Sequence, residues 1–288
     1  MIALVMLFNV GQWLFAPYLI RSLYGIRRVR REDAPEFYGT VEKLSARSGI
    51  KMPRIGLSRI QIPNAFAFGS PIAGNHLAIT QGLIDTLEKE EVEAVLGHEL
   101  GHIKHRDVQI MMMSSLLPSL FYLIGRWMMF SSYYGGYNRE KRGSGGAVLI
   151  GSASMLMYFV LSLLTLHLSR LREYFADAHS ASVVEEGSRK LSEGLAKITS
   201  KTSRIRKLGN RETFSLNGFK SLFISDPDTS EYDSAQISQL DYGVSDQMLV
   251  EQLIDRRISV GEKLIEVFSS HPNITKRLLA LKELQRQS

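Results

Sequence analysis

The stretch VLGHELGHIKHRD, residues 95–107, contains two histidines and a glutamate, His98, Glu99 and His102, at a spacing that could bind a metal ion. His98 and His102 are four positions apart, so on a helix they stack on one face, where two imidazoles can bind the same metal ion. Glu99 then projects beside them, where it could take a proton from a water at that ion. A solvated helix face with a few histidines is the alternative, but the joint pattern favours one zinc ion (Zn2+) per chain.

The same stretch has the periodicity of an amphipathic helix. Apolar residues recur at intervals of four, four and three, which forms one stripe at about 100° per residue. The members of this stripe are Val92, Leu96, Leu100 and Ile103. Gly97 and Gly101 each lower helix propensity by ~1 kcal/mol relative to alanine. Glycines at these positions indicate that another backbone or a ligand approaches the helix closely.

Composition restricts the metal ligands and the partners. The 288-residue chain contains no cysteine, which excludes disulfides and thiolate zinc sites, so histidine and carboxylate must hold any metal. Lys and Arg outnumber Asp and Glu by 35 to 29, which gives a formal net charge of +6. The location of these charges decides whether the surplus indicates nucleic acid or anionic lipid.

Three segments, residues 2–20, 108–125 and 147–169, carry no formal charge and are predominantly apolar. A helix needs about 20 apolar residues to span a bilayer. The segment 147–169 meets this length by itself, and the segment 108–125 meets it because the apolar residues WMMF continue it after Arg126. A buried pair of core helices is their alternative, which aromatic residues near the segment ends argue against. These aromatic residues are Trp127, Phe130, Tyr133, Tyr134 and Tyr137. For residues 2–20 the alternative is a secretory signal peptide, but the missing basic start and cleavage site favour a retained anchor.

The distribution of positive charge predicts the orientation in the membrane. The loop between the second and third segments holds three Lys and Arg residues, whereas nine lie close to the end of the first segment, the start of the second or the end of the third. These three are Arg139, Lys141 and Arg142. The positive-inside rule then places this loop outside and the rest of the chain in the cytoplasm. Because the basic surplus follows the membrane boundaries, the expected partner is the lipid bilayer, and no nucleic acid is expected.

A zinc protease needs a third protein ligand. Beyond residue 108, that ligand can return to the side of His98 only after an even number of spans, a condition that the hairpin meets. The segment RLREYFADAHSA follows directly, with Glu173 and Asp177 on one helical face. We predict Glu173 as the third ligand and Asp177 as an acid that orients a ligating imidazole. His105 is the alternative third ligand, but three ligands from so short a helical stretch would be geometrically cramped.

Four motifs resemble, in their order, those of the HtpX-type zinc metalloproteases, relatives of the Ste24 prenyl-protein proteases. They are NAFAFG (64–69), HELGH (98–102), REYFAD (172–177) and SHPNITKRLLAL (270–281). The resemblance extends along nearly the whole chain. It implies a gluzincin-like fold, which is a mainly α (α+β) catalytic domain with a small β-sheet, mounted on transmembrane helices. It also implies a membrane protease active in quality control and the stress response.

The resemblance also assigns roles to the outlying motifs. Residues of the first motif resemble an edge strand on which a substrate peptide lies extended, with Asn64 gripping a substrate carbonyl. This strand motif consists of Asn64, Ala65, Phe66 and Ala67. His271 resembles a late histidine that is a candidate donor to the oxyanion of the reaction. An ordinary hairpin strand and a structural histidine are the respective alternatives. Asp107 matches a family acid beyond the metal motif and is expected to fix local structure.

These observations together predict a zinc metalloendopeptidase of the cell membrane, with its catalytic domain on the cytoplasmic side. Its expected substrates are misfolded or damaged membrane proteins and unfolded polypeptides. The alternatives are a CAAX-type prenyl-protein endoprotease, whose Ste24-type members carry several more spans, and a non-catalytic membrane-anchored zinc scaffold, which would not need Glu99. The expected domains are an anchor (1–20), a first catalytic half (21–107), a transmembrane hairpin (108–169) and a second catalytic half (170–288).

Overall fold

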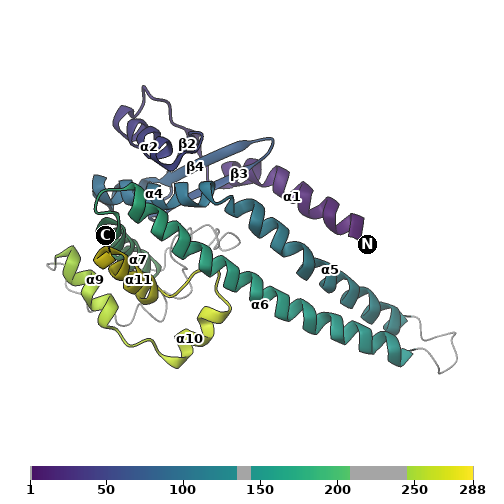
Figure 1. The fold of residues 1–288 in the computed structure, drawn as a ribbon. Helices are drawn as coiled ribbons and strands as arrows, with labels where there is room; N and C mark the ends of the chain where they lie inside the picture. Colours follow the sequence, from purple (N-terminus) through teal and green to yellow (C-terminus); the bar gives the residue numbers. More distant parts are fainter. Residues whose placement is uncertain (1, 135–143, 208–244, 288) are drawn as a thin grey trace.

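Three long helices extend from one end of the molecule, and each is long and apolar enough to cross a membrane (Figure 1). They are α1 (Ile2–Leu23), α5 (Asp107–Tyr134) and α6 (Ser144–Val183). In Figure 1, α5 and α6 lie side by side as an antiparallel pair, so the start of α5 and the end of α6 meet in the body of the protein. Their lengths and compositions agree with the prediction of three membrane helices.

The structure is a computed structural model that describes residues 2–134, 144–207 and 245–287. The three basic residues predicted to lie in the outer loop, together with Tyr137, fall outside the described residues. The boundaries of the predicted domains stay a prediction.

Helix α6 continues without a break from the membrane-spanning part of the molecule into its body. Its uncharged residues, 147–169, are the part suited to lipid, because charge in the hydrocarbon core is costly. Its last turns, residues 170–183, carry charged groups and pack against the helices of the body. The segment that carries Glu173 therefore belongs to the catalytic body and lies beyond the span.

A four-stranded sheet lies at the start of the catalytic body, with strand order β1-β2-β4-β3. The strands are β1 (Arg27–Arg28), β2 (Arg54–Ser58), β3 (Ala65–Ser70) and β4 (Gly74–Thr80). β4 pairs in parallel with β2 and antiparallel with β3, with Ala67 opposite Leu77. β3 is therefore an edge strand of the sheet, and it contacts the helix that carries the histidine motif.

Helices make up the rest of the body. They are α2 (Pro35–Ser48), α3 (Gln81–Ile84), α4 (Lys89–Lys104), α7 (Gly187–Lys207), α9 (Asp246–Asp255), α10 (Val260–Val267) and α11 (Ile274–Gln287). A mainly helical body with one small sheet on membrane helices confirms the predicted fold class.

Helix α4 lies at the centre of the body, between the sheet and α6. At its start, the side chain of Glu91 accepts a hydrogen bond of 2.8 Å from the backbone N–H of Glu88, which satisfies a donor of the first turn. Leu96 and Leu100 of the predicted apolar stripe are fully buried in the main core. The predicted close approach at the glycines is confirmed, because a methyl group at Gly101 would lie 3.0 Å from a Cα atom of α6.

Candidate active site

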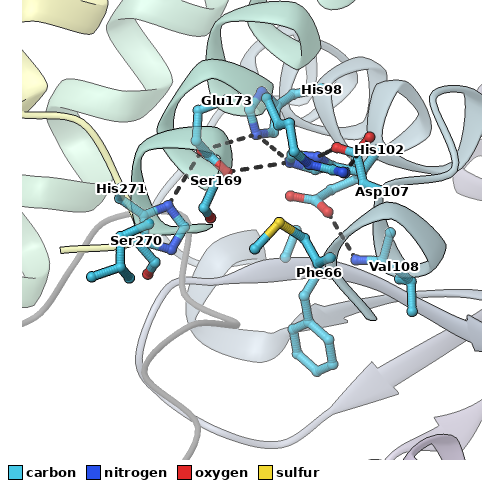
Figure 2. Close-up of a pocket in the computed structure, with 15 residues that line it drawn as sticks. Phe66, His98, His102, Asp107, Val108, Ser169, Glu173, Ser270 and His271 are labelled. Carbon is cyan, nitrogen blue, oxygen red and sulfur yellow. Dashed lines mark hydrogen bonds and ion pairs between the residues drawn. The ribbon is translucent and has the colours of Figure 1, made fainter. Parts of the chain in front are cut away.

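Five elements line a cavity of about 410 Å³ into which the histidine motif faces (Figure 2). Helix α4 contributes His98, Glu99 and His102, and α6 contributes Glu173. The start of α5 with Asp107, the edge strand β3, and the loop before α11 with His271 are the other elements of the lining. Because these elements are far apart in the chain, the site forms only in the folded protein.

The two imidazoles and the carboxylate of Glu173 face one another at short range (Figure 2). The Nε2 atoms of His98 and His102 are 3.1 Å apart. Glu173 places Oε2 3.7 Å from Nε2 of His98 and Oε1 3.6 Å from Nε2 of His102. His98 and Glu173 are buried, and His102 is partly exposed toward the cavity. The predicted trio is therefore brought together by two helices that are distant in the sequence.

The far side of the His98 ring is held by a buried acid. Nδ1 of His98 lies 2.8 Å from Oδ1 of Asp177, one helical turn beyond Glu173. Arg277 of α11 donates to both oxygens of Asp177, from Nε at 2.9 Å and from Nη2 at 2.6 Å. Burial favours the neutral form of Asp177, but Arg277 and His98 keep its pKa below its usual value. Asp177 thus orients His98, which is the usual role of a carboxylate behind a metal ligand.

The far side of the His102 ring is held in the same way. Its Nδ1 lies 2.5 Å from Oδ2 of Asp107, the first residue of α5. The other oxygen of Asp107 pairs with the guanidinium of Arg172. Burial lowers the pKa of His102, which favours the neutral imidazole that binds metals. Each imidazole therefore has a carboxylate behind it, and each carboxylate has an arginine behind it.

This arrangement is complementary to a cation. When Nδ1 of a neutral imidazole donates to a carboxylate, its Nε2 carries the lone pair. Two such lone pairs and one carboxylate then point at the same space, where a positive charge would relieve their repulsion. Tetrahedral zinc with bonds of ~2.0–2.1 Å needs ligand atoms ~3.3 Å apart, and the three separations of 3.1, 3.6 and 3.7 Å lie around this value. The donor set fits one zinc ion.

Glu99 lies next to this donor set but is held differently. Its carboxylate also lies within 4.8 Å of ligand atoms of His98 and His102, so distance alone would admit it as a ligand. However, its Oε2 accepts a hydrogen bond of 2.8 Å from the backbone N–H of Ala67 in β3. Burial raises the pKa of Glu99 to about 7, against an opposing effect of His98. A carboxylate with a pKa near neutrality suits a general base better than a ligand.

Glu173 has the opposite electrostatic setting. Burial alone would raise its pKa, but nearby positive groups hold the pKa well below its usual value. His271 places Nδ1 3.3 Å from Oε2, and Arg277 places Nη1 3.2 Å from the same oxygen. Glu173 is thus kept ionised, as a metal ligand must be. The contrast between Glu99 and Glu173 separates a proton acceptor from a permanent anion.

The remaining predicted residues are placed unequally. His271 lines the cavity, as do Ala65, Phe66 and Ala67. Asn64 is buried just before β3 and is not part of the cavity lining in the described structure, so its hydrogen bond to a substrate carbonyl stays a prediction.

Two other histidines lie behind the site. His179 is buried, and its Nε2 forms a hydrogen bond of 2.9 Å with Oγ of Ser48. Its ring centroid lies 5.8 Å from that of His105, the alternative third ligand. His105 does not line the cavity of the described site. The geometry therefore favours Glu173 over His105.

Arg277, like Arg172, is a site residue to which the sequence analysis assigned no role. It is fully buried and contacts both Asp177 and Glu173. A signal existed, because Arg277 lies within the apolar stripe of α11, between Ile274 and Leu281. A charged residue in the core-facing stripe of a helix requires a buried partner of opposite charge. The sequence provided this cue but did not identify the partner.

One wall of the cavity belongs to the membrane helices. Val108 and Met111 of α5 and Leu166 of α6 line it together with the polar residues. All three lie in the candidate spans; Val108 and Met111 are near the start of α5, and Leu166 is near the end of the uncharged segment of α6. The cavity therefore lies at the base of the membrane helices.

Comparison with known proteins identifies a family and relatives of this chain. The model of peptidase family M48 matches residues 32–285. A protein named Protease HtpX homolog from Aeropyrum pernix is 40% identical over 281 residues, which cover 95% of this chain and 82% of that protein. A Protease HtpX homolog from Thermoplasma acidophilum is 33% identical over 290 residues, covering 99% of this chain and 85% of that protein.

A solved structure shares the fold. The crystal structure of S. mikatae Ste24p aligns with a TM-score of 0.56, over 97% of this chain and 57% of that chain. The sequence identity is 16%, so this likeness concerns the fold alone.

Proposed function

This chain belongs to peptidase family M48, and from that premise we propose that it is a zinc-dependent endopeptidase that cleaves membrane proteins. Three apolar helices and the HtpX-type protease relatives make it a membrane protein. The observation that carries the proposal is the convergence of two oriented imidazoles and an ionised carboxylate beside Glu99. We place the catalytic body on the cytoplasmic side, on the basis of the charge distribution.

The residues divide the chemistry among themselves. His98, His102 and Glu173 would hold the zinc ion, which when bound supplies Lewis acidity to the water and the scissile carbonyl. Glu99 takes a proton from the attacking water and passes it to the leaving amine. His271 faces the cavity and would donate to the oxygen on which negative charge develops. Asp177 and Asp107 keep the two imidazoles in the required tautomer and orientation.

The edge of β3 offers a place for the substrate backbone. β3 is the last strand of the described sheet, so its outer edge pairs with no other strand there, although the N–H of Ala67 on that edge already donates to Glu99. An extended peptide can add to such an edge through main-chain hydrogen bonds. The small side chains of Ala65 and Ala67 let that peptide come close. The apolar wall from the spans favours loops and tails of membrane proteins, which reach the cavity along the bilayer surface.

A paired assay tests this proposal. Full-length chain in nanodiscs is incubated with an unfolded membrane-protein fragment and, separately, with a prenylated CAAX peptide, with and without a zinc chelator. Glu99→Gln should retain zinc and lose about 10²–10⁴-fold in cleavage rate, whereas the exposed Glu90→Gln of the same helix should cleave normally. Full cleavage by Glu99→Gln would refute the mechanism. Cleavage of the prenylated peptide alone would support the CAAX alternative, and no cleavage by zinc-loaded wild type would support the scaffold.

A further inference from the structure

Helix α10 has its polar and apolar sides reversed. Three large apolar side chains of this helix and its C-cap residue point outward, with Val260 74%, Leu264 61% and the C-cap residue Phe268 60% exposed. Two glutamates of the same helix, Glu262 and Glu266, are 8% and 7% exposed. A helix on a water-exposed surface buries its apolar face and exposes its charges. The apolar residues and the glutamates of α10 have the opposite arrangement, and its exposed charge is Lys263.

The buried charges fix this orientation. Glu262 pairs with Arg256 and accepts a hydrogen bond of 2.6 Å from the backbone N–H of Ser259. Glu266 lies 2.5 Å from Nζ of Lys276 and accepts a hydrogen bond of 3.2 Å from the backbone N–H of Asn273. Rotating α10 to bury its apolar face would break both ion pairs. The exposed apolar face is therefore imposed by the packing on the other side of the helix.

Helix α10 lies against the third membrane helix (Figure 1). Arg170 of α6 donates from Nη1 to the carbonyl oxygens of Glu266 and Ser269, both at 2.8 Å. The ring centroid of Phe268 lies 6.4 Å from that of Phe159 in α6. Phe159 is 48% exposed within the span and is eleven residues before Arg170, about 16 Å along the helix axis. The apolar face of α10 is thus continuous with the lipid-facing surface of α6.

We propose that α10 is an interfacial helix whose apolar face inserts into the leaflet on the catalytic side of the membrane. Its inserting residues are Val260, Leu264, Val267 and Phe268. The bilayer is the occupant that the position favours, because the face continues a span that itself faces lipid. An amphipathic helix that lies in the membrane interface buries its apolar side in this way.

Insertion would also position His271, an inference that rests on the proposed function. Ser269 is the second residue after α10, and its Oγ accepts a hydrogen bond of 3.1 Å from the backbone N–H of His271. Glu266 holds Asn273 on the other side of that histidine. The two contacts tie the position of α10 to the 3.3 Å approach of His271 to Glu173. The bilayer then acts as a support for His271, which is a positioning effect.

Depth labelling tests the insertion without reference to catalysis. Because the chain has no cysteine, Leu264→Cys accepts a single environment-sensitive fluorophore, and Met248→Cys on α9, also an exposed apolar position, is the matched control. Each is placed in nanodiscs of phosphatidylcholine and phosphatidylglycerol (3:1) that hold one chain. We expect quenching by acyl-chain-brominated lipid and protection from iodide at Leu264→Cys, with the reverse at Met248→Cys. Iodide access equal to the control, or protection without lipid quenching, would overturn the proposal.

Activity tests the positioning of His271. The variant Val260→Ser/Leu264→Ser/Phe268→Ser should keep its zinc but lose about 10- to 100-fold in kcat for peptide cleavage, because a displacement of ~1 Å at a catalytic group costs about that much. Met248→Ser should cleave at the wild-type rate. Lipid quenching with unchanged cleavage by the triple variant would refute the positioning effect. Lipid quenching without cleavage by any variant, wild type included, would refute the proposed function while the insertion stands.

Discussion

Replacing Arg277 by lysine tests whether the charge network behind the proposed metal ligands sets the properties of the site. The guanidinium donates two hydrogen bonds to Asp177 and lies 3.2 Å from Glu173. Lysine keeps the positive charge but lacks the planar fork, so it cannot maintain both contacts with Asp177. Arg277→Lys therefore isolates the geometry of the network from its net charge.

The magnitude follows from these contacts. Loss of one charge-assisted hydrogen bond in the buried network costs ~1.5–3 kcal/mol, and loss of a whole buried pair costs ~3–5 kcal/mol. We therefore expect the free energy of unfolding to fall by about 3 kcal/mol. For a chain of this size, that is a decrease of about 6–12 °C in the melting midpoint. Because Asp177 orients His98, zinc affinity should also fall about 10- to 100-fold.

Two measurements on the full chain in detergent test this reasoning. Thermal unfolding of metal-free protein reports the stability, and zinc retention against a graded chelator reports the affinity. Arg286→Lys, on the exposed last turn of the same helix, is the control. If Arg277→Lys matched this control in both melting midpoint and chelator midpoint, the buried network would have no energetic role and the reasoning would be refuted.

Two further predictions concern the metal and pH. Removal of zinc with a chelator should abolish cleavage and lower the melting midpoint, since a ligand at about 1,000 times its Kd stabilises the fold by ~4 kcal/mol. Added zinc should restore both cleavage and the midpoint. An unchanged midpoint would contradict a zinc site that forms only in the folded protein. Burial, together with the charge of Lys104, lowers the pKa of His179 to about 4. The unfolded state then takes up this proton first, so the contribution to stability is intact above about pH 6.5 and is lost as the pH falls toward 4. His179→Gln should reduce the loss of unfolding free energy between about pH 7 and 4.5 by ~2 kcal/mol. An equal loss in this variant and in the wild type would exclude His179 as the cause.

Several features of the fold and site could be predicted because they depend on local spacing. The four-residue interval of His98 and His102 predicted one helical face, and the structure places their Nε2 atoms 3.1 Å apart. The two glycines of α4 predicted a close approach, which α6 makes. The length of the uncharged segments predicted the membrane helices. Each of these inferences needed only helix geometry and the cost of placing charge in lipid.

Other features depend on contacts between distant parts of the chain. The reversed face of α10 is decided by ion pairs with Arg256 and Lys276, which helical periodicity within α10 does not reveal. The burial of Asn64 depends on β4, because Oγ1 of Thr80 in that strand accepts a hydrogen bond from the backbone N–H of Asn64. The different pKa values of Glu99 and Glu173 arise from different neighbours, although both side chains are buried.

The sequence by itself determined the reactive groups, the helices that carry them and the membrane helices, because helical periodicity and the length of an apolar run are local properties. Only the tertiary structure decided that Arg277 stands behind both Asp177 and Glu173, and that α10 faces outward with its apolar side. Electrostatic energy depends on distances through space, and the folding of the chain sets those distances between residues a hundred positions apart.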